Sequence, residues 1–178
     1  MSPSTPASPE APRRLQFVGA GGLALVADAW GREGDPPVLL LHGGGQTRHA
    51  WRSTAVRLAA AGFHAVMLDL RGHGLSGKPH DVNAYGTQMC EDVVRLMDHL
   101  HLAKAHVVGY SLGGFITLKL ATLHPDRLLS IGVLGAGWDK PENSPTFNVL
   151  SRAGERGLER SAESEDQHPA RRRLAGLL

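Results

Sequence analysis

A serine between two glycines is the clearest chemical feature of the sequence. Gly109, Ser111 and Gly113 form the pattern Gly-x-Ser-x-Gly within HVVGYSLGGF, residues 106–115. A serine hydroxyl becomes a nucleophile for acyl transfer when a base takes its proton and N–H groups bind the oxyanion that forms. The pattern alone also fits a structural serine in a tight turn, because glycine and serine are common in turns. The segments around it must decide between the two.

Ser111 lies between an expected strand and an expected helix. The apolar run AHVVGYS, residues 105–111, predicts a buried strand, and LGGFITLKLATLHPDR, residues 112–127, predicts a helix closed near Pro125. Flanking glycines keep Cβ atoms away from neighbouring backbone, so the chain can turn sharply and hold the serine in a strained conformation. The helix beginning at Leu112 points free N–H groups at the same spot. This context favours a nucleophile.

The rest of the chain alternates expected strands and helices. Residues 15–30 predict an antiparallel hairpin around Gly21 and Gly22. Apolar runs predict buried strands at 38–43, 64–70 and 128–137, and apolar stripes predict helices at 49–63, where Gly62 suits the helix end, and at 85–102. Such alternation is typical of right-handed βαβ units, so we expect a mostly parallel α/β sheet with an antiparallel start.

Two more glycine-rich loops follow strands of this sheet. HGGG, residues 42–45, follows the strand at 38–43, and DLRGHGLSG, residues 69–77, follows the next strand. Glycine N–H groups can approach a substrate oxygen closely, so HGGG can form half of an oxyanion hole with the Leu112 N–H. Loops at the carboxyl ends of parallel strands lie on one edge of the sheet, which predicts a shared pocket.

The polar residues of these loops have simpler expected roles. His42 and His73 are expected to shape the pocket, and Asp69 and Arg71 are expected to brace their loop. Four other histidines, at the ends of expected elements, are expected on the surface: His99, His101, His106 and His124.

Three segments together resemble the α/β-hydrolase superfamily with a serine nucleophile. They are LLLHGGGQTRHAW, DLRGHGLSGKP and VVGYSLGG, and the resemblance covers about residues 15–140. It implies an α/β-hydrolase fold, Ser111 as the nucleophile, and Gly44 and Leu112 as donors of the oxyanion-hole N–H groups. Serine in place of aspartate argues against the haloalkane dehalogenase branch. It points to hydrolysis of a small-molecule ester, thioester, lactone or carbon–carbon bond, or to cofactor-free perhydrolase chemistry.

The same resemblance implies partners for the serine that are hard to find. The family places an acid and then a histidine after its seventh and eighth strands, and this sequence ends after the expected sixth strand. We therefore expect an incomplete copy that lacks the last strands, with Asp139 and His168 as candidate substitutes. The alternative is a non-catalytic binding or interaction module derived from the same fold.

The expected organisation has three parts. Residues 1–14 are expected to be a disordered lead-in, 15–140 the α/β-hydrolase core with six strands, and 141–178 a partial lid or a poorly ordered tail. The strand at 128–137 would be an apolar edge, which predicts self-association through strand pairing.

Composition excludes several other functions. Nineteen basic and 17 acidic residues are spread along the chain, which does not suggest nucleic acid binding. The single cysteine, Cys90, is expected to be a small apolar helix residue, and cysteine usage fits a reducing, cytoplasmic compartment. The sequence has no run of 18 consecutive apolar residues, so no membrane span is expected. Neither a dinucleotide-binding loop nor a metal-ligand cluster is found, so no cofactor and no metal is expected.

Overall fold

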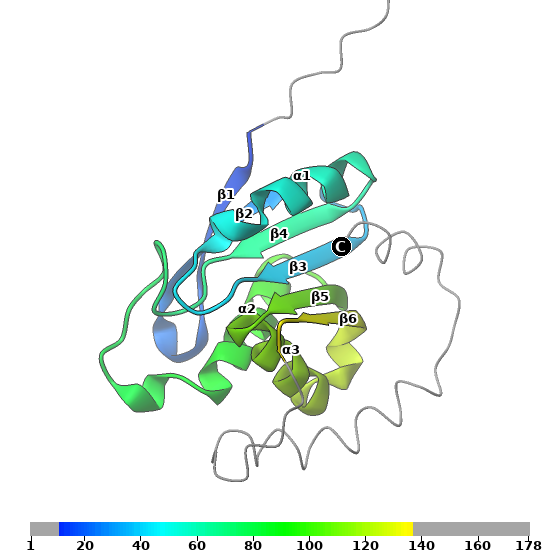
Figure 1. Ribbon diagram of the computed structural model, residues 1–178. Helices are drawn as coiled ribbons and strands as arrows, with labels where there is room; N and C mark the ends of the chain where they lie inside the picture. Colours follow the sequence, from blue (N-terminus) through cyan, green and yellow to red (C-terminus); the bar gives the residue numbers. More distant parts are fainter. Residues whose placement is uncertain (1–10, 137–178) are drawn as a thin grey trace, which may run out of the picture.

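The computed structural model describes residues 11–136, which form one six-stranded sheet with helices on both faces (Figure 1). The strands are β1 (Arg13–Val18), β2 (Ala24–Trp30), β3 (Pro37–Leu41), β4 (His64–Leu68), β5 (Ala105–Tyr110) and β6 (Leu128–Leu134). The α-helices are α1 (Arg52–Ala60), α2 (Thr87–His99) and α3 (Leu112–Leu123). Short 3₁₀ turns are η1 (Ala20–Gly22), η2 (Arg48–Trp51), η3 (Val82–Ala84) and η4 (Pro125–Arg127).

The strand order is β1-β2-β4-β3-β5-β6. β1 and β2 form an antiparallel hairpin, β2 is antiparallel to β4, and the pairs β4–β3, β3–β5 and β5–β6 are parallel. The hairpin connection passes through Gly21 and Gly22, whose φ angles of 67° and 77° suit glycine. This arrangement confirms the expected mostly parallel sheet with an antiparallel hairpin. It also brings the carboxyl ends of β3 and β5 side by side.

The two faces of the sheet carry separate apolar cores. α1 covers one face over β2 and β4, while α2 and α3 cover the other face (Figure 1). In β3, Leu39 and Leu41 belong to the core under α2 and α3, whereas Val38 and Leu40 belong to the core under α1. A strand that is buried on both faces needs a continuous apolar run, which explains the pattern VLLL.

Two helices end in the same capping motif. After α1, the Gly62 N–H donates to the Ala59 carbonyl and the Phe63 N–H donates to the Leu58 carbonyl, both across 3.0 Å. Gly62 has a φ of 84°, as this motif requires, and it ends the helix as predicted. After α2 the corresponding left-handed position is occupied by His101, with a φ of 54°.

Some boundaries differ from the expected ones. β1 begins at Arg13, inside the expected lead-in of 1–14, because Arg13 pairs with Ala29 of β2. The expected helix at 49–63 opens with the 3₁₀ turn η2 and becomes α-helical at Arg52. The end of the expected core and the whole of 141–178 lie outside the described residues. Within the described residues β6 is an edge strand; self-association through it stays a prediction.

One histidine was placed wrongly from the sequence. His106 was expected on the surface, but it lies within β5 and is only 1% exposed. Its ring packs edge-on against Phe63 on the α1 face, and its Nδ1 lies 2.7 Å from the Ser130 hydroxyl of β6. Strand pairing with β6 buries the residue, and its ring nitrogen can pair with the half-buried Ser130 hydroxyl.

Candidate active site

Ser111 occupies a strained turn between β5 and α3. Its φ of 49° and ψ of −111° lie in a region that side chains with a Cβ rarely adopt. The flanking glycines allow this turn: a Cβ on Gly109 would lie 2.0 Å from the Gly113 carbonyl oxygen, and a Cβ on Gly113 would lie 2.2 Å from the Leu41 carbonyl oxygen. The sequence pattern therefore has the steric cause that was expected for it.

The N–H groups at the turn are not equivalent. The Ser111 N–H donates to the Leu134 carbonyl across 2.8 Å, and the Gly113 N–H donates to the His42 carbonyl across 3.1 Å. Between them, the Leu112 N–H has no acceptor among residues 11–136. It is the first residue of α3, where N–H groups lack helical partners and the helix dipole is positive. One free donor therefore stands next to Ser111.

The loop after β3 repeats this pattern. It forms a turn closed by the Gln46 N–H, which donates to the Gly43 carbonyl across 3.2 Å, with Gly45 at a φ of 73°. The Gly43 N–H donates to Gln46 Oε1 across 2.9 Å, and the Gly45 N–H donates to His73 Nε2 across 3.3 Å. The Gly44 N–H, on an exposed residue, has no acceptor in the described part of the chain.

His42 links this loop to the loop after β4 through its two ring nitrogens. Its Nε2 accepts the Leu70 N–H across 3.1 Å, so its Nδ1 carries the proton and donates to the Gly43 carbonyl across 2.8 Å. Burial lowers the pKa of His42, because a charged imidazolium would lose its hydration there. The ring meets His73 edge-on at 5.0 Å. Both histidines therefore contact the loop backbone, in keeping with a role in shaping the pocket.

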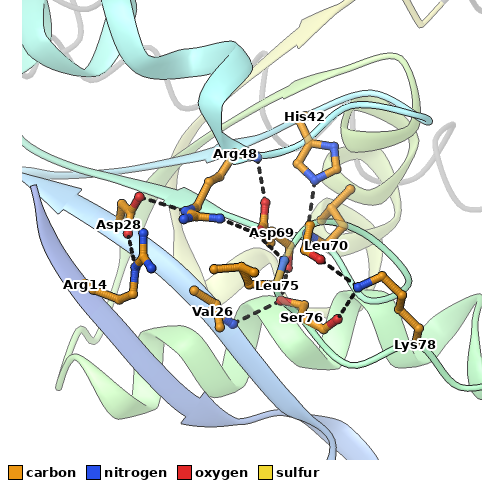
Figure 2. A network of polar contacts seen from close by, with 11 residues as sticks. Arg14, Val26, Asp28, His42, Arg48, Asp69, Leu70, Leu75, Ser76 and Lys78 are labelled. Carbon is orange, nitrogen blue, oxygen red and sulfur yellow. Dashed lines mark hydrogen bonds and ion pairs between the residues drawn. The ribbon is translucent and has the colours of Figure 1, made fainter.

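A buried network of charges fixes the loop after β4 (Figure 2). Asp69 accepts the Arg48 backbone N–H across 2.7 Å, Arg48 Nη1 across 2.5 Å and the Leu75 N–H across 2.8 Å. Arg48 also donates from Nε to Asp28 across 2.7 Å, and Arg14 Nε reaches the same carboxylate across 3.0 Å. Burial alone would raise the pKa of Asp28, but the hydrogen bonds from Arg48 and Arg14 outweigh it and the pKa is lowered.

A second buried pair braces the same loop on its far side. Arg71 donates from Nε and Nη2 to the two oxygens of Asp92, each across 2.6 Å, and Nη2 also reaches the Ala20 carbonyl across 3.0 Å. Asp69 and Arg71 thus make structural contacts, as was expected. Sequence reasoning missed Arg48 and Asp92, because an arginine in QTRHAW and an aspartate in a helical stripe carry no local signal of burial.

Tyr110 is a third residue that the sequence did not single out. It directly precedes Ser111 and is 44% exposed. Its ring lies between two glycines, since a Cβ on Gly43 would be 2.9 Å from Tyr110 Cδ1 and a Cβ on Gly135 would be 2.5 Å from Cε2. The ring therefore separates the loop after β3 from the end of β6 at the same edge of the sheet.

Other groups named from the sequence stand apart from this geometry. Cys90 is buried in α2, where burial raises the pKa of its thiol to about 12, so it is not a nucleophile near neutral pH. Asp139 and His168 lie outside the described residues. Among residues 11–136, no group of three or more histidine, cysteine or acidic residues is placed to hold a metal ion. Over the same range, no helix is long and apolar enough to cross a bilayer.

Comparisons with known proteins agree with this fold. A family model described as alpha/beta hydrolase fold matches residues 36–175. Epoxide hydrolase A of Mycobacterium tuberculosis is 31% identical over 142 residues, which cover 79% of this chain and 44% of that protein. A putative carbamate hydrolase of a Caulobacter species is 45% identical over 84 residues, which cover 45% of this chain and 30% of that protein.

Solved structures give the same result. The crystal structure of epoxide hydrolase A from Mycobacterium thermoresistibile superposes with a TM-score of 0.63 at 31% identity, and the match covers 70% of this chain and 38% of that one. The chain thus spans less than half the length of the relatives and structures that it matches here. Fold, strand order and a family model that extends over most of the sequence coincide, and the chain belongs to the alpha/beta hydrolase fold family.

Proposed function

We propose that this chain carries the nucleophile and the oxyanion hole of a serine hydrolase that acts on a small-molecule carboxylic ester or a related acyl compound. Ser111 Oγ attacks the carbonyl carbon, and the carbonyl electron pair moves to its oxygen. The N–H groups of Gly44 and Leu112 bind that oxyanion. A base takes the hydroxyl proton and passes it to the leaving group, and water then cleaves the acyl-serine ester.

The observation that supports this proposal most is the pairing of N–H groups at the two loops. In each set of three consecutive residues, 43–45 and 111–113, the outer N–H groups have acceptors, and the middle one has none among the described residues. Polar backbone groups that are left without partners are uncommon and suit a ligand. Two such donors at adjacent strand ends, one of them beside a strained serine, fit an oxyanion hole.

The residue at the turn favours acyl chemistry over epoxide opening, although the similar proteins include epoxide hydrolases. A serine oxygen that opened an epoxide would remain bound through an ether, which water does not release under mild conditions. A serine that attacks an ester gives an acyl intermediate, which water cleaves readily. Ser111 therefore supports turnover of an acyl substrate.

The test is labelling of the full chain with a fluorophosphonate probe, with Ser111→Ala as the control. We expect mass spectrometry to find the phosphonyl group on Ser111 and no labelling of the variant. Hydrolysis of p-nitrophenyl acetate should be lost together with labelling. Candidates for the base and its acid are His168 and Asp139, so His168→Gln and Asp139→Asn should slow labelling if they serve Ser111.

Absence of labelling would overturn the proposal, provided that the chain is folded. A cooperative thermal melt and a dispersed NMR spectrum establish the fold independently of activity. Folded but unreactive protein would favour the alternative of a binding module that keeps the pocket without its chemistry. Labelling of the Ser111→Ala variant would assign the reaction to another residue.

A further inference from the structure

Gln46 makes hydrogen bonds with both the N–H and the carbonyl of Gly43. Its side-chain Oε1 accepts the Gly43 N–H across 2.9 Å, and its own backbone N–H donates to the Gly43 carbonyl across 3.2 Å. Gly43 is buried, so its N–H needs an acceptor. The residue that supplies it is the last residue of the same turn, and the loop is closed on itself.

Two hydrogen bonds to the Gly43 carbonyl set the direction of the Gly44 N–H. The peptide between Gly43 and Gly44 is planar and trans, so the Gly44 N–H points away from the Gly43 carbonyl. That carbonyl accepts two donors, the Gln46 N–H and His42 Nδ1–H. A carbonyl held by two donors cannot rotate without breaking both bonds, so the Gly44 N–H keeps one direction.

Besides Gln46, the loop is held by His42 Nδ1–H at the Gly43 carbonyl and by the Tyr110 ring, which lies against Gly43. Three consecutive glycines have more backbone freedom than any other residues, and ordering them costs more conformational entropy. A Cβ on Gly44 would meet nothing within 4 Å, so Gly44 itself is not packed. The single bond from Gly45 to His73, at 3.3 Å, holds the far side of the turn. Gln46 supplies two of the bonds that order this loop, and its side chain supplies the one to the Gly43 N–H.

We propose that Gln46 is a positioning residue: its side chain takes the Gly43 N–H and thereby presents the Gly44 N–H as the donor of this loop. The inference rests on the proposed function, in which Gly44 binds the oxyanion. Gln46 acts through the backbone and touches no reacting atom. Without this acceptor the Gly43 N–H is left unpaired and the turn from Gly43 to Gln46 is held by one bond fewer. The Gly43 carbonyl keeps its two donors, but the Gly44 N–H is less firmly held relative to Leu112.

The test compares Gln46→Ala, which removes the acceptor, with Gln46→Glu, which keeps one. Gln88→Ala is the matched control, because Gln88 is exposed and lies in α2. Fluorophosphonate labelling is followed at 0.5 M salt, which screens the new carboxylate. We expect the labelling rate at saturating probe to fall about 10- to 100-fold in Gln46→Ala, with little change in the half-saturating concentration. Gln46→Glu should keep the labelling rate within about threefold of the wild-type rate.

A second readout does not depend on reactivity. Amide hydrogen exchange at Gly43 should accelerate at least about tenfold in Gln46→Ala and stay close to wild type in Gln46→Glu and Gln88→Ala. Unchanged exchange and unchanged labelling in Gln46→Ala would overturn the inference while Ser111 remains reactive. If wild-type chain is not labelled, the proposed function fails, and the exchange data still decide whether Gln46 orders the loop. Equal losses in Gln46→Ala and Gln46→Glu would also overturn it.

Discussion

The Gly113 N–H donates to the His42 carbonyl oxygen across 3.1 Å and so ties the turn that carries Ser111 directly to the loop that carries Gly44. The bond joins the start of α3 to the end of β3, two segments far apart in the sequence. It is possible because Gly113 has no Cβ where α3 approaches β3. This contact, together with the pairing of β3 with β5, therefore fixes how the Gly44 and Leu112 N–H groups lie relative to each other.

Gly113→Ala should disrupt both stability and the site. The new Cβ would lie 2.2 Å from the Leu41 carbonyl oxygen, so α3 must move away from β3. We expect a loss of about 1–3 kcal/mol in the free energy of unfolding, as for other overpacked positions, together with slower labelling of Ser111. Urea unfolding measures the first effect. Gly44→Ala is the matched control for stability, since a Cβ there meets nothing within 4 Å. An equal loss in the free energy of unfolding for both variants would contradict this cause.

Ser111→Gly should make the protein more stable and chemically inert. Ser111 holds a φ of 49° that costs a residue with a Cβ about 1–3 kcal/mol, and glycine removes most of that strain. After the larger entropy loss of glycine on folding, we expect a gain of about 1 kcal/mol in thermal or urea unfolding. Ser111→Ala keeps a Cβ and should show no such gain. Equal stability of the two variants would mean that the turn is unstrained.

His101→Gly should stabilise the end of α2. His101 has a φ of 54° at the position where the Leu102 N–H returns to the Met97 carbonyl across 2.8 Å, and glycine suits that position best. The expected gain is roughly 0.5–1 kcal/mol in the free energy of unfolding. His99→Gly, two residues earlier and within the helix, should instead cost about 0.5 kcal/mol in helix propensity, and it also loses the stacking of His99 on Phe17. If both substitutions changed the free energy of unfolding in the same direction, the capping role assigned to His101 would be wrong.

Apolar runs and glycine positions were enough to predict most of the fold. VLLL in β3 and GYSLGG at the turn around Ser111 each allow few structures. A strand buried on both faces demands apolar residues, and a turn with close backbone contacts demands glycines beside the serine. Gly62 ended its helix as predicted for the same reason. Local steric requirements are visible in a local pattern, so these elements could be found without a structure.

Contacts between distant segments were not predictable in the same way. Burial of Arg48 depends on Asp28 and Asp69, which lie 20 and 21 residues away. His106 lies in a run that predicts a buried strand, but its polar ring at the start of that run suggested exposure; the pairing of β5 with β6 buries it. Which N–H groups of the two loops lack an acceptor within residues 11–136 also depends on partners elsewhere in the fold. The resemblance suggested Gly44 and Leu112 as the two donors, and the structure adds which neighbouring N–H groups are occupied.

Stability should fall as the pH drops below 6.5 because of two buried histidines. Burial lowers the pKa of His42 and of His64 below the ordinary 6.5, and Arg13 near His64 acts in the same direction. The unfolded chain then binds protons that the folded protein does not. Each histidine's contribution is complete above 6.5 and is lost as the pH falls toward the folded pKa, by at most about 1.4 kcal/mol per pH unit.

Urea unfolding between pH 7 and pH 5 measures this dependence, and His42→Gln and His64→Gln should each flatten it. The two variants differ in function. Protonated His42 would place an Nε2–H against the Leu70 N–H and break the contact that supports the loop carrying Gly44, so Ser111 labelling should weaken in acid in step with stability. His64 lies at the opposite end of β4, and His64→Gln should leave that pH profile of labelling unchanged. A slope that neither variant reduces would assign the pH dependence to other groups.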